Sequence, residues 1–296
     1  MPNNIIDGKR IAQMIKDEVR EETRMLRETH GVVPGLAFLL VGDDPASRTY
    51  VASKERACDY CGIHSVTLRL PAETHEAEVH DKISAWNNDP EIHGILVQLP
   101  LPEHIDTDRI IEAISPVKDV DGFHPVNVGK LMIGQQGMLP CTPAGIQQML
   151  IRSGIATEGK HVVVIGRSNI VGKPIANILL QKAAGANAVV TVAHSAAADI
   201  SVFTRQADIL IVATGRVNTV TADMVREGVV VIDVGINRIA DNTRERGYRI
   251  VGDVDFDAVA EKASLITPVP GGVGVMTIAM LMKNTLTAAR HAVMPG

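Results

Sequence analysis

The stretch "VVVIGRSNIVGKP", residues 162–174, indicates a buried strand followed by a tight turn and a helix. Gly166 ends the apolar strand, and Gly172 opens the helix, whose first backbone N–H groups would point at any anion bound there. The pattern departs from the dinucleotide fingerprint G-x-G-x-x-G, because Ser168 stands where the second glycine belongs. By itself it is compatible with an ordinary tight turn as well as with a dinucleotide site.

Further apolar runs beyond this stretch repeat the alternation of strand and helix. Strands are expected at 161–166, 188–194, 207–215, 229–235 and 264–270, with a helix over 171–184 after the first of them. Dense Val and Ile runs at this spacing are typical of a parallel, doubly wound sheet that is buried on both faces. We therefore predict an α/β domain from this half of the chain.

The strand that ends "AHSAAAD" bears on which nucleotide such a domain would select. A site for NAD usually has an acidic residue here to bind the ribose 2′-hydroxyl, whereas a site for NADP has neutral or basic groups. Ser195 occupies this region, Arg167 is available from the first turn, and Asp199 lies four residues beyond Ser195. The chemistry favours NADP.

The N-terminal half of the sequence predicts a second α/β domain. Helices are expected over 11–30, 45–61 and 75–87, and strands over 35–42, 64–70 and 94–100, an order typical of a parallel sheet. The Gly- and Pro-rich segment 115–143 breaks the alternation, and we interpret it as the passage between domains. A helix should then run from Thr142 to about Ser153, and a final helix over 276–290 should pack back on the first domain.

Composition narrows the class of ligand. The formal net charge of -5 and the lack of any Lys/Arg-rich block argue against nucleic acid or an anionic membrane as partner and favour a small molecule. The N-terminus lacks the pattern of an export signal and no apolar run is long enough to span a bilayer, so we predict a cytoplasmic protein. Cys58 and Cys61 could form a redox pair or half a zinc site, but no second Cys/His pair accompanies them. We favour buried thiols and predict no metal site.

Four polar features suggest a ligand site in the N-terminal half. Tyr50 and Lys54 lie one turn apart on an expected helix, among small residues instead of carboxylates. An amphipathic helix whose lysine reaches water is the simpler interpretation of this pair. Gln98 at the carboxyl end of a strand and Asp121 near a turn favour a site, because ligands bind at such strand ends, although each could be structural. In the other half, the loop "TPVPGGVG", residues 267–274, would let backbone approach a ligand closely.

Taken in order, "YVASK", "VQLPLP", "KDVDGFHP", "PCTPAG", "GRSNIVGKP", "VIDVGIN", "VGDV" and "TPVPGGVG" resemble the motifs of the FolD family, the bifunctional methylenetetrahydrofolate dehydrogenases and methenyltetrahydrofolate cyclohydrolases. The resemblance covers essentially the whole chain. It implies a folate-binding catalytic domain of residues 1–141 and 280–296, a Rossmann-type NADP domain of residues 142–279, and folate in the cleft between them. It also implies a homodimer and a place in one-carbon metabolism and purine biosynthesis.

The resemblance assigns roles to individual residues. Lys54 corresponds to the catalytic lysine, Gln98 to its amide partner, Tyr50 to the aromatic residue that packs on the folate, and Asp121 to a pterin-binding carboxylate. Arg167 and Ser195 match positions that receive the 2′-phosphate of NADP. The other implied cofactor contacts are Gly166, Ser168, Ile170, Gly172 and Ile236, and the other implied folate contacts are Val97, Leu99, Pro270, Gly271, Gly272, Gly274 and Thr277.

Two reactions at one site are implied. Hydride would pass from 5,10-methylenetetrahydrofolate to NADP⁺, and water would then open the methenyl product to 10-formyltetrahydrofolate with help from Lys54. A lysine desolvated in a cleft without a carboxylate partner should have its pKa lowered toward the range useful for proton transfer.

The sequence departs from the family pattern at three places. Val275 stands where proline is common, "AAA" follows Ser195 where a basic or hydroxyl residue is common, and residues 182–190 look slightly long. A monofunctional dehydrogenase is one alternative, against which the full set of Lys54, Gln98 and Asp121 argues. A non-catalytic nucleotide-binding protein of the same fold is another, but such a protein should have lost the lysine or the glycine loop.

Overall fold

Two compact units make up the chain. The central unit comprises Met1–Ala12 and Thr142–Thr277, and the N-terminal unit comprises Gln13–Cys141 and Ile278–Gly296. The structure, a computed structural model, describes residues 4–244 and 247–294, so the ends of the predicted domains at residues 1–3 and 295–296 lie outside the described residues. No helix within these described ranges combines the length and apolar character needed to cross a membrane.

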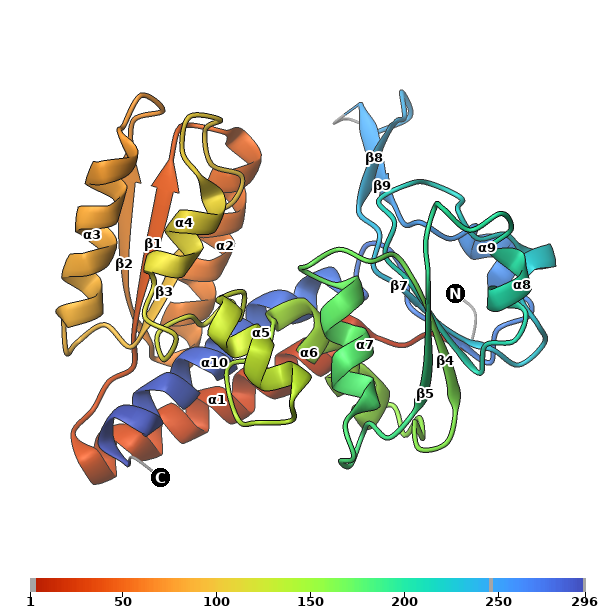
Figure 1. Cartoon of the computed structure of the whole chain (residues 1–296), viewed down its shortest axis with the longest axis horizontal. Helices are drawn as coiled ribbons and strands as arrows, with labels where there is room; N and C mark the ends of the chain where they lie inside the picture. Colours follow the sequence, from red (N-terminus) through yellow and green to blue (C-terminus); the bar gives the residue numbers. More distant parts are fainter. Residues whose placement is uncertain (1–3, 245–246, 295–296) are drawn as a thin grey trace. The chain divides into compact units, whose positions relative to one another are not determined.

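The N-terminal unit is built on a three-stranded parallel sheet in the order β2-β1-β3 (Figure 1). The strands are β1 (Gly35–Val41), β2 (His64–Leu70) and β3 (Gly94–Val97), and every residue of the central strand β1 is buried. The accompanying helices are α1 (Gly8–His30), α2 (Pro45–Cys61), α3 (Glu76–Asn88), α4 (Thr107–Ala113), α5 (Pro125–Met132) and α10 (Gly274–Val293). The predicted alternation of strand and helix is therefore present.

Two helices cover one face of this sheet. Ala37, Leu39 and Val41 of β1 pack in one buried cluster with Val79 of α3 and Ile110 of α4. Leu36, Phe38 and Leu40, which point to the opposite face of β1, are also fully buried. Burial on both faces explains why β1 is a continuous apolar run instead of an alternating one.

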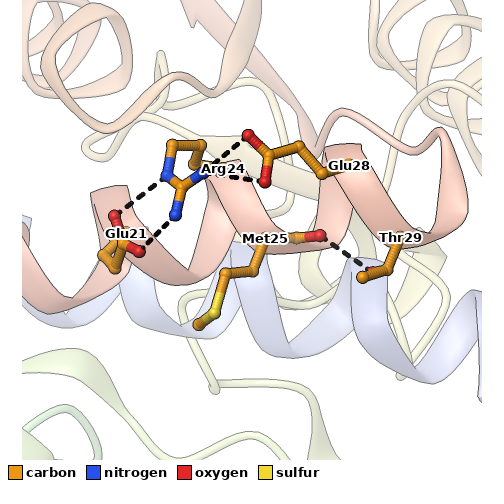
Figure 2. A network of polar contacts seen from close by, with 5 residues as sticks. All are labelled: Glu21, Arg24, Met25, Glu28 and Thr29. Atoms are coloured by element: carbon orange, nitrogen blue, oxygen red, sulfur yellow. Dashed lines mark hydrogen bonds and ion pairs between the residues drawn. The ribbon is translucent and has the colours of Figure 1, made fainter.

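The long helix α1 shows the amphipathic pattern expected from its sequence. Ile15, Val19 and Leu26 form a buried stripe. On the exposed side, Arg24 pairs with Glu21 and with Glu28, each at 2.6 Å, as Figure 2 shows. Such exposed pairs contribute only a few tenths of a kcal/mol, roughly, so α1 is held mainly by its buried stripe.

The central unit contains a five-stranded parallel sheet in the order β10-β7-β6-β4-β5, which confirms the predicted doubly wound fold. Its strands are β4 (His161–Ile165), β5 (Val189–Ala193), β6 (Ile209–Val212), β7 (Val230–Asp233) and β10 (Leu265–Ile266). Its helices are α6 (Cys141–Arg152), α7 (Gly172–Leu180), α8 (Ser201–Thr204), the 3₁₀ turn Ala222–Met224 and α9 (Phe256–Ala260). An antiparallel hairpin, β8 (Asn237–Ala240) and β9 (Tyr248–Val251), was not predicted.

Several predicted elements are shorter than expected, among them the strands predicted over 207–215 and 264–270, which are limited to Ile209–Val212 and Leu265–Ile266. The helix expected over 171–184 ends at Leu180, and Gly185 and Asn187 beyond it adopt positive φ. The strand expected over 94–100 ends at Val97. Pro100 and Pro102, which follow it, have no N–H to donate to a neighbouring strand. The segment 115–143, interpreted as the passage between domains, contains the helix α5, and the boundary between the two units falls within it, after Cys141.

The first residues of the chain group with the central unit, whereas the sequence assigned them to the first domain. The N–H of Ile6 donates to the carbonyl of Ile266 at 2.9 Å, next to β10. The amide of Asn4 donates to the carbonyls of Ala260 and Ala263. Backbone pairing along the edge of the sheet thus attaches this segment to the central unit before α1 begins.

Candidate active site

A buried lysine lies at the centre of the polar cluster in the N-terminal unit. Lys54 of α2 is 8% exposed, and its Nζ donates a 2.9 Å hydrogen bond to Oε1 of Gln98. The other end of the Gln98 amide donates to the carbonyl of Leu99 at 2.7 Å, and its backbone N–H donates to the carbonyl of Leu39. Gln98 is therefore fixed at both ends, and it offers its oxygen to the lysine.

Asp121 adds a carboxyl group to this cluster. Burial raises the pKa of Asp121 to about 6, although the charge of Lys54 acts in the opposite direction. Burial also lowers the pKa of Lys54, and Asp121 is the main group that opposes the shift. The predicted lowering of the lysine pKa is present, but Lys54 is not without a carboxylate, since the fold brings Asp121 to it from another segment.

Neighbouring side chains fix the backbone around Asp121. The carboxylate of Asp119 accepts hydrogen bonds from the N–H groups of Gly122, Phe123 and His124. On α10, the amide of Asn284 donates to the carbonyl of Val120 at 2.8 Å and to that of Leu139 at 2.9 Å. These bonds tie the segment before Asp121 to the segment that leads into α6.

Close backbone packing completes this support. Gly122 has φ of 79°, and a Cβ there would lie 2.5 Å from the backbone nitrogen of Pro140. The buried thiol of Cys141, next to this segment, donates to the carbonyl of Val120. Sequence reasoning did not select Cys141 or Asn284 as site residues, although Cys141 lies in the quoted motif "PCTPAG".

The remaining predicted residues of this unit differ in exposure. Tyr50, one turn before Lys54 on α2, is 48% exposed and leaves a ring available to a ligand. Val97 is buried in the sheet core, and Leu99 is half-buried. Cys58 and Cys61 are buried free thiols, as predicted, and burial raises the pKa of both.

The central unit has a cavity of about 280 Å³ at the carboxyl ends of β4, β5 and β6. The sheet order reverses between β4 and β6, and such switch points are where open α/β sheets bind nucleotides. Four of the predicted cofactor residues line it, namely Gly166, Arg167, Ser168 and Ser195. Its other lining residues are Ile165, His194, Ile200, Ala213, Thr214, Arg216 and Thr219.

The first turn of this nucleotide pocket depends on its two glycines. Gly166 has φ of 121°, and a Cβ there would meet the carbonyl oxygen of Ala213 at 2.2 Å. A Cβ on Gly172 would lie 2.2 Å from the carbonyl oxygen of Gly166, so the start of α7 packs directly on the turn. The hydroxyl of Ser168 accepts from the N–H groups of Val171 and Gly172, so the residue that departs from the fingerprint stabilises the helix N-terminus.

Other predicted residues of the central unit lie outside this pocket. Ile170 and Ile236 are about half exposed, and Ile236 contacts the position of Gly274. Asp199, judged too distant to bind ribose, accepts hydrogen bonds from the backbone and hydroxyl of Ser201. Its carboxylate therefore serves the start of α8.

The glycine loop 267–274 packs on the protein's own backbone. Gly271 has φ of 106°, and the carbonyl oxygen of Gly272 approaches Gly8 so closely that a Cβ on Gly8 would lie 2.2 Å from it. Pro270, between the loop's two valines, is exposed, and the hydroxyl of Thr277 is 2.8 Å from that of Thr142. The conformational demands of this loop thus arise at least partly from internal packing.

A larger hollow of about 780 Å³ in the N-terminal unit runs between α1 and the end of α2. Some of its polar groups pair with one another: Arg24 pairs with Glu21, and Tyr60 donates to Asp17 at 2.5 Å. Arg20 lies over the Tyr60 ring. Among its described lining residues, this open hollow has no buried lysine or carboxylate of the kind found around Lys54.

The fold and the two polar sites define a class of protein. A nucleotide pocket at the switch point of one parallel sheet, together with a buried lysine, amide and carboxylate at the ends of another, is typical of a dinucleotide-dependent α/β enzyme.

Comparison with known proteins identifies the family. The model of the tetrahydrofolate dehydrogenase/cyclohydrolase catalytic domain matches residues 6–121, and that of its NAD(P)-binding domain matches residues 140–293. The bifunctional protein FolD of Syntrophus aciditrophicus is 60% identical over 97% of each chain. The chain therefore belongs to the tetrahydrofolate dehydrogenase/cyclohydrolase family.

Solved structures agree in fold. The bifunctional FolD of Campylobacter jejuni matches with a TM-score of 0.91 and 51% identity, over 97% of this chain and 98% of that one. The Trypanosoma brucei dehydrogenase-cyclohydrolase, solved with NADP and an inhibitor, matches with a TM-score of 0.92 and 40% identity over 99% of both chains.

Proposed function

We propose that this protein oxidises 5,10-methylenetetrahydrofolate with NADP⁺ and hydrolyses the resulting methenyl compound to 10-formyltetrahydrofolate. Family membership at 60% identity over nearly the whole chain supports both activities. Within the molecule, the observation that supports the hydrolytic step is the buried Lys54. Its amine is hydrogen-bonded to Gln98, and the charge of Asp121 acts on its pKa.

The residues of the central unit fit an NADP-type nucleotide. The pocket at the switch point presents the guanidinium of Arg167 and the hydroxyl of Ser195, which suit a 2′-phosphate. The turn between β4 and α7 has glycine at positions 166 and 172, where a Cβ would meet backbone 2.2 Å away, and glycines at such a turn let a pyrophosphate approach the backbone closely. When bound, NADP⁺ supplies the hydride acceptor for the first reaction.

Lys54 is proposed to move protons in the hydrolytic step. Because burial disfavours its ammonium form and lowers its pKa, Lys54 gives up its proton more readily, and its neutral amine would accept a proton from the water that attacks the methenyl carbon. The same proton can then pass to the folate nitrogen as its bond to that carbon breaks, while the new hydroxyl on the carbon releases its own proton to solvent and becomes the formyl C=O. The hydrogen bond to Gln98 holds the amine in one orientation through both transfers.

Tyr50 and Asp121 are proposed to hold the substrate. The half-exposed ring of Tyr50 offers a stacking surface to a flat heterocycle. The carboxyl of Asp121 can accept hydrogen bonds from pterin donors. Val97, Leu99, Pro270, Gly271, Gly272, Gly274 and Thr277 are kept as proposed folate contacts, and Ile170 and Ile236 as proposed cofactor contacts.

An absorbance assay tests both activities together. The enzyme is mixed with 5,10-methylenetetrahydrofolate and either NADP⁺ or NAD⁺, and methenyl formation and its later decay are followed. Formation with NADP⁺ and enzyme-dependent decay is the expected result. Formation without accelerated decay would indicate a monofunctional dehydrogenase, and no reaction would indicate a nucleotide-binding protein.

A lysine variant separates the two steps. Lys54→Met should slow enzyme-dependent methenyl decay at least about 100-fold, the usual scale of general acid–base catalysis. Lys82→Met, which removes an exposed lysine of α3, is the matched control and should leave decay unchanged. Full hydrolytic activity in Lys54→Met would contradict the proposed role.

The setting of the enzyme is also proposed. The sequence pattern and the family resemblance support a cytoplasmic homodimer that acts in one-carbon metabolism and supplies purine biosynthesis. Light scattering on the purified protein measures the oligomeric state directly, and a monomer at micromolar concentration would count against the dimer.

A further inference from the structure

Two buried carboxylates of the central unit have no part in the proposed chemistry. Asp233 ends β7 within the motif "VIDVGIN", and Asp253 follows β9 within "VGDV". They are 2% and 0% exposed, respectively. Burial of a carboxylate destabilises a fold unless several hydrogen-bond donors satisfy its oxygens. The donors to Asp233 and Asp253 therefore show which backbone segments each carboxylate holds in place.

Asp233 holds the backbone of Asp253. Its carboxylate accepts hydrogen bonds from the N–H groups of Gly235, Asp253 and Val254 at 3.0, 2.9 and 3.1 Å. Gly252 fits against it so closely that a Cβ there would lie 1.8 Å from a carboxylate oxygen. The backbone of Asp253 is therefore fixed by its hydrogen bonds to the Asp233 carboxylate.

Asp253 in turn holds the segment that follows β6. One of its carboxylate oxygens accepts from the N–H and the hydroxyl of Thr214, at 2.6 and 3.0 Å, and from the N–H of Gly215 at 2.8 Å. Its backbone carbonyl accepts from the N–H of Thr219 at 2.7 Å. A single residue thus anchors residues 214–219, which we call the β6 loop, at both ends.

The bonds within the β6 loop fix the backbone of Arg216. Its N–H donates to the hydroxyl of Thr214, and its carbonyl accepts from the hydroxyl of Thr219 at 2.8 Å. These two hydroxyls are also 2.9 Å from each other. Because Thr214 bonds Asp253 as well, the placement of Arg216 depends on that carboxylate.

Arg216 belongs to the wall of the nucleotide pocket. Thr214, Arg216 and Thr219 line the pocket together with Arg167 and Ser195, which come from the ends of β4 and β5. Among the described residues that line it, two are arginines and none is acidic. The negative charge of Asp253 is taken up by the donors of the β6 loop and by the amide of Asn237.

We propose that Arg216 is a second cationic contact for a phosphate group of the bound nucleotide, and that Asp253 is the positioning residue that holds it there. The inference rests on the proposed nucleotide-binding function of this pocket. Arginine suits phosphate because its planar guanidinium donates paired hydrogen bonds. It also adds positive charge to a site whose Ser195 is followed by alanines.

Calorimetric titration of the full-length protein with NADP⁺ and with NAD⁺ tests the proposal. Arg216→Gln should weaken NADP⁺ binding about tenfold, the scale of one charge-assisted contact, and should reduce the dependence of binding on salt. If NAD⁺ binding is unchanged, the contact is to the 2′-phosphate, and if it falls equally, the contact is to the pyrophosphate. Arg238→Gln, an exposed arginine of β8 that stacks on Tyr248, is the matched charge control.

Asp253→Asn should cause a similar loss of affinity and of salt dependence although Arg216 is kept. The double variant should bind within about twofold of Asp253→Asn alone, because a displaced Arg216 has no contact left to lose. Thr214→Val, which removes only the bridging hydroxyl, makes the same test if Asp253→Asn does not fold. Urea unfolding of each variant, followed by circular dichroism, reports whether its folding is intact.

Three results would overturn the inference. These are unchanged NADP⁺ affinity in Arg216→Gln, an equal loss in Arg238→Gln, and a double variant whose loss is the product of the single losses. If the unmodified protein binds neither nucleotide, the proposed function itself fails, which is a different outcome from tight binding that ignores Arg216.

Discussion

Replacing Asp121 with asparagine should stabilise the N-terminal unit at neutral pH. The same substitution should weaken substrate binding, because it removes the proposed pterin-binding carboxylate. The ionised carboxylate of Asp121 destabilises the folded state, because burial raises its pKa from 3.8 to about 6. Each pKa unit corresponds to about 1.4 kcal/mol, so the ionised carboxylate costs the folded state about 3 kcal/mol. Asparagine has a similar shape and carries no charge to desolvate.

The pH dependence follows from proton linkage. In the folded protein Asp121 takes up its proton near pH 6, whereas in the unfolded chain it does so near pH 3.8. Between these values the folded state binds more protons, so the free energy of unfolding falls as pH rises, and the full cost is present above about pH 7. The variant lacks this term. Its advantage over the parent should be near zero at pH 4 and approach about 3 kcal/mol at pH 7.5.

Urea denaturation between pH 4 and 7.5 measures this difference. The only tryptophan of the chain, Trp86, lies on α3 in the N-terminal unit, so its fluorescence reports the unfolding of the unit that contains Asp121. Asp81→Asn, an exposed carboxylate on the same helix, is the control and should show a difference that does not change with pH. A flat or decreasing difference for Asp121→Asn would mean that Lys54 outweighs burial, and it would refute the reasoning.

Three further substitutions test the backbone and the choice of nucleotide. Gly122→Ala should destabilise the N-terminal unit by about 3 kcal/mol in the same urea assay, because φ is 79° and the new Cβ would lie 2.5 Å from Pro140. Gly172→Ala should weaken NADP⁺ binding at least about tenfold in calorimetry, because the new Cβ would lie only 2.2 Å from the carbonyl oxygen of Gly166 and would force the turn to move. Unchanged affinity would exclude this turn from the site. Ser195→Asp should lower the preference for NADP⁺ over NAD⁺ at least about tenfold in kcat/KM by repelling the 2′-phosphate, and undiminished use of NADP⁺ would show that this pocket wall is assigned wrongly.

Local patterns in the sequence determined much of what the structure shows. Continuous apolar runs predict strands buried on both faces, because a parallel sheet covered by helices leaves no polar side, and β1, β4 and β6 follow this rule. The spacing of Ile15, Val19 and Leu26 predicts α1, because it places these three apolar side chains on one buried face of a helix. The family prediction, made from eight motifs in order, is confirmed by the comparisons.

Only the tertiary structure decided how distant segments meet. The electrostatic effect of Asp121 on Lys54, the bonds from Asn284 to two separate carbonyls, and the attachment of the β6 loop to Asp253 all involve residues far apart in the chain. The hairpin β8–β9 and the pairing of Ile6 with Ile266 are of the same kind. Periodicity and turn chemistry describe each segment's preference for a conformation, whereas burial and long-range hydrogen bonding exist only after the segments have packed. For that reason the sequence could predict candidate site residues, whereas packing decided their burial, their hydrogen-bond partners and the direction of their pKa shifts.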